Sequence, residues 1–239
     1  MSTFKQGQAV EDYIFPLTKA RRISGNHYLF DKLVGTAFFI GQEGYAMTAA
    51  HVIEQCFDGN AQNEVVLAFF WEAEKQEWFT VEIIDWEKHP SEDVGVIKVP
   101  GDGWRSKVIL EGAPQQSSLA YACWGYPIET SSEARQLYPQ MVEKMDLVYT
   151  QGYIRRRISR ELYPTVIFRG RQFYELSEQV GHGNSGAPVL IRREQGGENW
   201  DCIGVYIGEK ERGTVSYAVR AEAFTGWIPE MVGKELGEI

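Results

Sequence analysis

The 239-residue sequence has no long apolar run, few cysteines and no excess of positive charge. No stretch approaches the about 18 consecutive apolar residues that a transmembrane helix requires. The first residues lack the charged and then apolar layout of a secretory signal peptide. The three cysteines stand far apart without any Cys-x-x-Cys spacing, whereas a small secreted domain normally shows paired cysteines. We therefore expect a cytoplasmic protein with three buried thiols.

The composition is typical of a globular protein with a large core. Hydrophobic residues make up 44% of the chain and aromatic residues 13%, which together exclude a disordered protein. The net charge of −9 argues against general attraction to DNA or to anionic lipid. We therefore expect no nucleic-acid partner and no membrane partner.

The charge is unevenly distributed along the chain. Residues 54–93 alone carry −9, whereas residues 153–171 carry +5. The basic stretch includes the run Arg155, Arg156, Arg157 and Arg160, which leaves a nucleic-acid surface open as an interpretation. We favour a solvated strand edge, or pairing with the acidic first half, because the run lies in a strand-like stretch with arginines on alternating faces.

Short strand-like runs separated by turn residues dominate the sequence. They fall into two groups joined by a connector rich in Gly, Pro and polar residues, which indicates two packed β-barrels or one large sandwich. The runs are residues 33–40, 45–50, 64–71, 78–84, 94–99, 118–124, 147–154, 165–168, 188–191, 202–207 and 215–219. The segment from 221 to 236 has apolar residues at helical spacing and predicts a terminal amphipathic helix.

Three short segments carry residues that can do chemistry together. Residues 47–52 read Met-Thr-Ala-Ala-His-Val and contain His51. Residues 93–99 open with Asp93 before an apolar strand, and residues 181–188 form the glycine-rich turn Gly-His-Gly-Asn-Ser-Gly-Ala-Pro. A serine hydroxyl is a poor nucleophile near neutral pH, so a histidine must take its proton while a carboxylate orients the imidazole.

The glycine-rich turn also suits the stabilisation of an oxyanion. Its small residues allow the backbone N–H groups of Gly183 and Ser185 to converge on a developing negative charge. Losing one such donor typically costs about 2.7–4 kcal/mol of transition-state stabilisation, so the turn is sterically demanding. We therefore expect an oxyanion hole at Gly183 and Ser185.

The three segments resemble the signature segments of chymotrypsin-like (trypsin-like) serine proteases. Thr-Ala-Ala-His, Asp-x-x-x-Ile-Lys and Gly-Asn-Ser-Gly-x-Pro occur here in the family's order. The Gly-Asn-Ser-Gly form is similar to the bacterial HtrA/Deg branch and its trypsin-2 relatives. The resemblance extends from about residue 34 to Trp227-Ile228. It implies an all-β fold of two six-stranded antiparallel β-barrels with a short C-terminal helix.

The resemblance also implies how the chain is organised. We expect residues 1–239 to form a single protease domain, whose parts are a first barrel over about 14–100, a connector over 101–117, a second barrel over 118–220 and a terminal helix over 221–236. Many HtrA-type proteins continue into a PDZ domain, and we expect none here. A protein that activates the enzyme or delivers its substrates would then be a separate molecule.

Each candidate catalytic residue has a structural alternative. His51 could be a core histidine, Glu92 competes with Asp93 as the orienting acid, and Ser185 could be an ordinary turn residue. The partners along the chain favour the catalytic interpretation for all three. The elbow of an α/β-hydrolase is a weaker match, because it needs Gly-x-Ser-x-Gly and Ala187 fills the last position.

The resemblance implies a substrate pocket near the nucleophile. The residue six before it, Gln179, is expected at the pocket base, and Tyr206, Val215 and Tyr217 are expected in the walls. His182 either lines the cleft or is an exposed loop side chain. Because Gln179 is neutral, we expect a small or medium uncharged side chain before the scissile bond, although Glu209 at the rim could attract a basic one. No residues have zinc or calcium spacing, so we expect neither metal nor cofactor.

The sequence departs from the zymogen-activated members of the family. Residues 22–25, Arg-Ile-Ser-Gly, resemble an activation site, but Asn184 replaces the Asp that would pair with a freed N-terminus. We therefore expect activity without cleavage there. The resulting prediction is an intracellular bacterial serine endopeptidase with the triad His51, Asp93 and Ser185, acting on protein or peptide substrates. A pseudo-protease that binds or recruits partners, and an esterase or acyl-transferase, are the alternatives.

Overall fold

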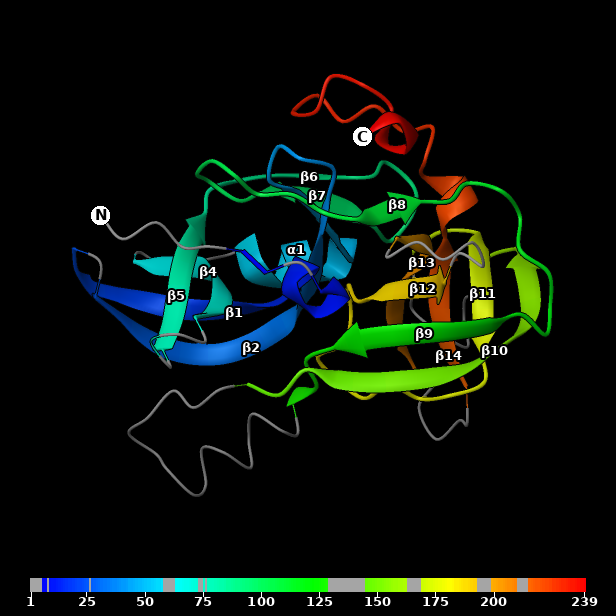
Figure 1. Cartoon of the computed structure of the whole chain (residues 1–239), viewed down its shortest axis with the longest axis horizontal. Helices are drawn as coiled ribbons and strands as arrows, with labels where there is room; N and C mark the ends of the chain where they lie inside the picture. The colour runs from blue at the N-terminus through cyan, green and yellow to red at the C-terminus, as the bar shows by residue number, and fades with distance from the viewer. Residues whose placement is uncertain are drawn as a thin grey trace.

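A computed structural model describes residues 6–7, 9–25, 27–57, 63–72, 75, 77–128, 145–162, 169–192, 199–209 and 215–239. These residues form two mainly antiparallel sheets that lie side by side, the first in the N-terminal half and the second in the C-terminal half (Figure 1). The expected strand at 165–168 lies outside the described residues.

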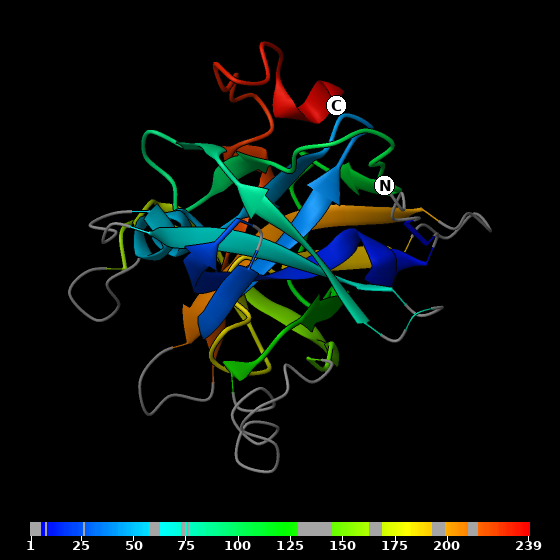
Figure 2. The same cartoon turned by 90° about the vertical axis from the view of Figure 1, so that its left-hand side faces the viewer.

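The first sheet has seven strands in the order β5-β4-β1-β2-β3-β7-β6 and curls into a half-barrel (Figure 2). Its strands are β1 (Ile14–Ser24), β2 (His27–Ile40), β3 (Tyr45–Thr48), β4 (Glu64–Glu72), β5 (Glu77–Ile83), β6 (Asp85–Lys88) and β7 (Gly95–Lys98). The turn between β2 and β3 uses Gly41 at φ +61° and Gly44 at φ +77°, a backbone region that favours glycine. The two strands pair in antiparallel fashion on either side of this turn and form a hairpin.

The second sheet closes on itself through the pairing of β12 with β13, which gives a six-stranded barrel. A seventh strand, β8, joins its outside by pairing in parallel with β13. The strands are β8 (Val108–Leu110), β9 (Ala120–Gly125), β10 (Val148–Ser159), β11 (Gln172–Leu176), β12 (Pro188–Arg192), β13 (Trp200–Glu209) and β14 (Ser216–Arg220). The chymotrypsin-like double barrel is thus confirmed, with seven strands in each sheet instead of six.

One α-helix lies wholly within the described residues, α1 (Ala50–Phe57). The apolar run before it suggested a strand continuing to Ala50, whereas β3 ends at Thr48. The helix buries Val52, Ile53 and Cys56, so packing of one apolar face stabilises it. It therefore follows β3 almost at once and carries His51 in its first turn.

The C-terminal segment differs from the single helix expected over residues 221–236. The structure has two short 3-10 helices there, η2 (Ala221–Ala223) and η3 (Leu236–Glu238), and a further one near the N-terminus, η1 (Val10–Tyr13). Pro229 lacks a backbone N–H and breaks the helical pattern between the other two. The segment returns to the first sheet, where the Tyr45 hydroxyl donates to the carbonyl of Met231 at 2.8 Å (Figure 1).

The arginine run on β10 is exposed because the strand is irregular. A register shift between Ile154 and Arg156 places three consecutive arginines on the outer face, where strict alternation would expose only two. Arg155 and Arg156 pair with Glu175, and Arg157 pairs with Glu222. These glutamates belong to the second half of the chain, so the expected pairing with the acidic first half does not occur at this run.

All three cysteines are buried and unpaired, as predicted. Burial raises the pKa of the Cys56 and Cys202 thiols to about 12, and it also raises the pKa of Cys123. At neutral pH all three therefore remain protonated thiols that pack as small apolar groups.

Candidate active site

His51 and Asp93 meet through two hydrogen bonds. The ring Nδ1 of His51 lies 2.8 Å from Oδ2 of Asp93, and the backbone N–H of His51 donates to Oδ1 at 2.9 Å. The Asp93 side chain is 3% exposed and that of His51 is 27% exposed. A buried carboxylate at this distance accepts a hydrogen bond from Nδ1–H, which leaves Nε2 as the ring nitrogen that can take up a proton.

The competing acid, Glu92, points elsewhere. Its Oε2 accepts the backbone N–H of Arg171 at 3.1 Å, and Arg171 directly precedes strand β11 of the second barrel. Glu92 is 6% exposed, so this bond satisfies a buried carboxylate and ties the Asp93 loop to the second barrel. Of the two neighbouring acids, only Asp93 contacts His51.

Ser185 is held against the first sheet by close backbone approaches. Its carbonyl accepts the N–H of Thr36 at 2.8 Å. A Cβ added to Gly35 would lie 2.8 Å from that carbonyl oxygen and 2.7 Å from Val52, the residue after His51. The Ser185 turn therefore lies beside the first turn of α1. The Ser185 hydroxyl itself donates to the carbonyl of Ile207 at 3.3 Å.

The turn around Ser185 depends on two glycines. Gly183 has φ +92° and Gly186 has φ +93°, values that strain any other residue. A Cβ on Gly186 would also overlap the carbonyl of Thr36 and the hydroxyl of Thr48. The sequence pattern of small residues thus has a steric cause at both positions.

The peptide between His182 and Gly183 has a fixed orientation. Its carbonyl accepts the N–H of Ile128 at 2.7 Å, and a trans peptide directs its N–H to the opposite side. The N–H of Gly183 therefore points away from Ile128. Neither this N–H nor that of Ser185 donates to an acceptor in the described part of the chain. Both donors are available to a bound group.

Thr36, which no sequence motif indicated, connects the Ser185 turn to both barrels. Its buried hydroxyl donates to the carbonyl of Gly183 at 3.1 Å and accepts the N–H of Tyr126 at 3.0 Å. The Thr48 hydroxyl in turn donates to the Thr36 carbonyl at 2.7 Å. A polar residue beside Gly35 inside the apolar run 33–40 was the signal that could have identified it.

Asn184 is fully buried within the turn. Its side-chain amide donates to the carbonyls of Val180 and of Gly181, the latter at 3.1 Å. These bonds brace the loop before Ser185 without any charged partner. Ile23, in the segment that resembles an activation site, is 67% exposed near the end of β1.

The predicted pocket residues are only partly brought together. Tyr206 is fully buried in the barrel interior with Val180 and Ala218. Tyr217 precedes Ala218 on β14, so its side chain points to the opposite face of the strand, and it packs into the main core. Gln179 and His182 are exposed, and Val215 is half-buried.

Glu209 connects the loop before Ser185 to the end of β13. Its Oε1 accepts the backbone N–H of Gly181 at 2.7 Å and the hydroxyl of Tyr206 at 3.1 Å. The loop before Ser185 is thereby joined to the end of β13.

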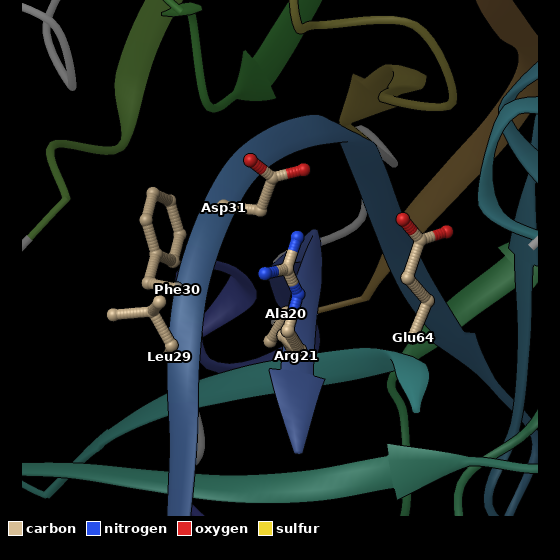
Figure 3. A pocket seen from close by; sticks show the side chains of 6 residues that line it. All are labelled: Ala20, Arg21, Leu29, Phe30, Asp31 and Glu64. Atoms are coloured by element: carbon tan, nitrogen blue, oxygen red, sulfur yellow. The ribbon is translucent and has the colours of Figure 1, made fainter. Parts of the chain in front are cut away.

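A separate shallow pocket lies on the first sheet (Figure 3). It is lined by residues of β1, β2 and β4, none of which is a candidate site residue: Ala20, Arg21, Leu29, Phe30, Asp31 and Glu64. Within the described ranges, no cluster of three or more His, Cys, Asp or Glu side chains could hold a metal ion. None of the described helices combines the length and the apolar character needed to span a membrane.

The fold defines a class, the chymotrypsin-like double-barrel proteins. The family model for the trypsin-like peptidase domain matches residues 35–197. This match covers more than half of the chain, so the protein belongs to the trypsin-like peptidase domain family. No curated protein sequence matches it.

Solved structures agree with the fold. The active form of the Rv3671c protease from M. tuberculosis is 18% identical, with 94% of this chain and 82% of that chain covered and a TM-score of 0.61. Deg5 is 16% identical, with 88% and 84% covered and a TM-score of 0.60. The HtrA-type protease AlgW with a decapeptide is 14% identical, with a TM-score of 0.61; 90% of this chain but only 62% of AlgW is covered. At these identities the likeness shows the fold alone.

Proposed function

We propose that the protein is a serine endopeptidase that cleaves protein or peptide substrates through an acyl-enzyme. Ser185 is the nucleophile, His51 the general base and acid, and Asp93 the group that orients His51. The observation that carries this proposal is the 2.8 Å contact between His51 Nδ1 and the buried Asp93, at the junction where the Ser185 turn meets α1. Family membership adds support from the same three segments.

The chemistry follows from the hydrogen bonds. Ser185 Oγ turns from the Ile207 carbonyl toward His51 Nε2, which takes its proton as Oγ attacks the substrate carbonyl carbon. The resulting imidazolium is stabilised by Asp93. His51 then gives the proton to the departing amine as the C–N bond breaks. In the second half of the reaction His51 takes a proton from water as the water oxygen attacks the ester carbon, and it returns that proton to Ser185 Oγ as the acyl–Oγ bond breaks.

The oxyanion is assigned to the backbone N–H groups of Gly183 and Ser185, which have no other acceptor in the described residues. Each donor is worth about 2.7–4 kcal/mol in the transition state by the precedent of other serine proteases. The fixed orientation of the peptide before Gly183 supports this role, because a preorganised donor needs no reorganisation during the reaction.

Two finer assignments accompany the proposal. The three buried, unpaired cysteines favour a reducing compartment, and we assign the protein to the bacterial cytoplasm. We also propose that a separate protein delivers substrates or activates the site.

Hydrolysis of an unfolded protein substrate tests the proposal. The purified chain should fragment such a substrate, and the Ser185→Ala variant should not, with an unchanged melting temperature because the hydroxyl does chemistry rather than packing. Equal fragmentation by both proteins would remove Ser185 from the role of nucleophile.

One observation favours a second candidate, a pseudo-protease that acts as a binding module. In the structure the Ser185 hydroxyl donates to the carbonyl of Ile207 instead of to His51. A fluorophosphonate probe separates the two candidates, because it labels a serine only when the histidine activates it. Labelling supports the peptidase, and a folded protein that resists the probe supports the binding module.

A further inference from the structure

The loop that presents Asp93 is closed at its base. Residues 89–94 connect β6 to β7, and the backbone N–H of His89 donates to the carbonyl of Val94 at 3.0 Å. Asp93 stands just before this closing bond. Its carboxylate reaches His51 only if the loop keeps its shape.

The ring of His89 fills the inside of this loop. Its Nδ1 lies 2.9 Å from the backbone N of Glu92 and 3.2 Å from that of Ser91. Both backbone groups can only donate, so Nδ1 must be the acceptor and the ring proton must be on Nε2. One side-chain atom therefore organises two of the peptide groups immediately before Asp93.

The ring is also held from outside the loop. His89 is 8% exposed, and Trp227 of the C-terminal segment packs against it edge-on with ring centroids 5.0 Å apart. Arg169, which precedes β11, is close enough for its positive charge to act on the ring, and Glu92 and Asp93 are the charged residues of the loop itself. Burial first, and the Arg169 charge second, lower the pKa of His89 to about 4, so the ring is neutral at neutral pH.

We propose that His89 is a positioning residue for catalysis: its Nδ1 holds the Ser91 and Glu92 peptides so that Asp93 is presented to His51. This inference rests on the proposed peptidase function. It assigns to a second histidine a role distinct from proton transfer, since His89 contacts neither substrate nor His51. The packing of Trp227 fixes the ring plane, and the acceptor nitrogen fixes the loop.

Two substitutions separate the acceptor from the packing. His89→Asn places an amide oxygen close to the position of Nδ1 and retains the acceptor, but it loses the ring that contacts Trp227. His89→Phe keeps an aromatic ring against Trp227 and replaces the acceptor with C–H. A purely structural role predicts that Phe is the better substitute, whereas positioning predicts that Asn is.

The measurement is the rate of fluorophosphonate labelling of Ser185 across pH, with the melting temperature of each variant as a control. We expect His89→Asn to label within about threefold of the wild type with the same pH midpoint. His89→Phe should label at least tenfold more slowly, and its midpoint should move to lower pH, because a displaced Asp93 no longer stabilises the His51 imidazolium. Folded His89→Phe protein with the wild-type rate and midpoint would overturn the proposal.

A readout on the wild-type protein covers the case in which His89→Phe does not fold. The ¹⁵N resonances of the His89 ring report its tautomer, and we expect a bare Nδ1 and a protonated Nε2 at neutral pH. A proton on Nδ1 would contradict the proposal directly. This readout does not need an active enzyme. A wild type that fails to label would count against the peptidase function, whereas the ring tautomer would still test the His89 hydrogen bonds.

Discussion

The hydroxyl of Thr36, on the first sheet, donates to the carbonyl of Gly183 at 3.1 Å, in the turn that carries Ser185. The same hydroxyl accepts the N–H of Tyr126 at 3.0 Å, so one side chain connects three distant segments. The geometry of the oxyanion turn therefore depends on the docking of the two barrels, and not on the glycine-rich segment alone.

Replacing this threonine should affect activity more than its size suggests. Thr36→Val leaves a buried carbonyl and a buried N–H without partners, at a cost of about 1–3 kcal/mol each before relaxation. We expect kcat to fall by one to two orders of magnitude, while Thr36→Ser, which keeps the hydroxyl, stays within about threefold of the wild type. Peptide hydrolysis and thermal unfolding of both variants check this. Equal activity of the Val and Ser variants would show that the hydroxyl does not shape the turn.

The two neighbouring acids should respond very differently to neutralisation. Asp93→Asn keeps the side-chain shape but favours the wrong imidazole tautomer, and we expect a loss of about 10⁴ in kcat by the chymotrypsin precedent. Glu92→Gln still offers an oxygen to the N–H of Arg171 and should remain close to fully active. The kcat of both variants is measured with the same peptide substrate and compared with that of the wild type. A dead Glu92→Gln beside a nearly active Asp93→Asn would reverse the assignment.

The neutral side chain of Gln179 predicts a preference for small or medium uncharged side chains before the scissile bond. Tyr206 is fully buried with its hydroxyl on Glu209, so it packs the barrel interior, and Tyr206→Phe, which keeps the ring, should leave this preference unchanged. Glu209→Gln keeps both acceptor contacts and should leave this preference unchanged. A peptide library measures all three proteins. A wild-type preference for Arg or Lys that disappears in Glu209→Gln would show instead that the carboxylate sets the specificity.

The stability of the protein should fall in mild acid because of His89. Its pKa is lowered from 6.5 to about 4, mainly by burial, so between these values the unfolded chain binds a proton that the folded chain excludes. The free energy of unfolding therefore decreases as pH falls from about 6.5 toward about 4, by on the order of 2 kcal/mol. His89→Asn removes this titration and should show a smaller decrease. Urea unfolding of both proteins at about pH 7 and about pH 4.5 tests this, and identical decreases would refute it.

The sequence was most informative where side-chain type alone carries the chemistry. The order of His51, Asp93 and Ser185 and the glycines around the serine led to the double barrel and to residues that the structure brings to one junction. The hydrophobic pattern was least informative where tertiary packing determines the secondary structure. The start of α1 reads like a strand because Ala49 and Ala50 extend an apolar run, and only burial of one face of the helix selects the helical form.

The C-terminal segment and the roles of Thr36 and His89 could not be predicted from residue spacing either. The apolar spacing around Trp227 indicated a helix, but Pro229 removes a donor in its middle and the segment instead packs on the first sheet. Thr36 and His89 act through contacts with residues far away in the sequence or through a loop shape that no spacing encodes. Such contacts appear only once the two barrels are in place.

Mapping of fluorophosphonate labelling by mass spectrometry tests the central claim most directly. We expect one adduct on the peptide that contains Ser185 in the wild type, and none in folded His51→Ala or Ser185→Ala protein. An adduct on another residue, or equal labelling of Ser185 in the folded His51→Ala variant, would contradict the assignment of His51 and Ser185 as an activated pair.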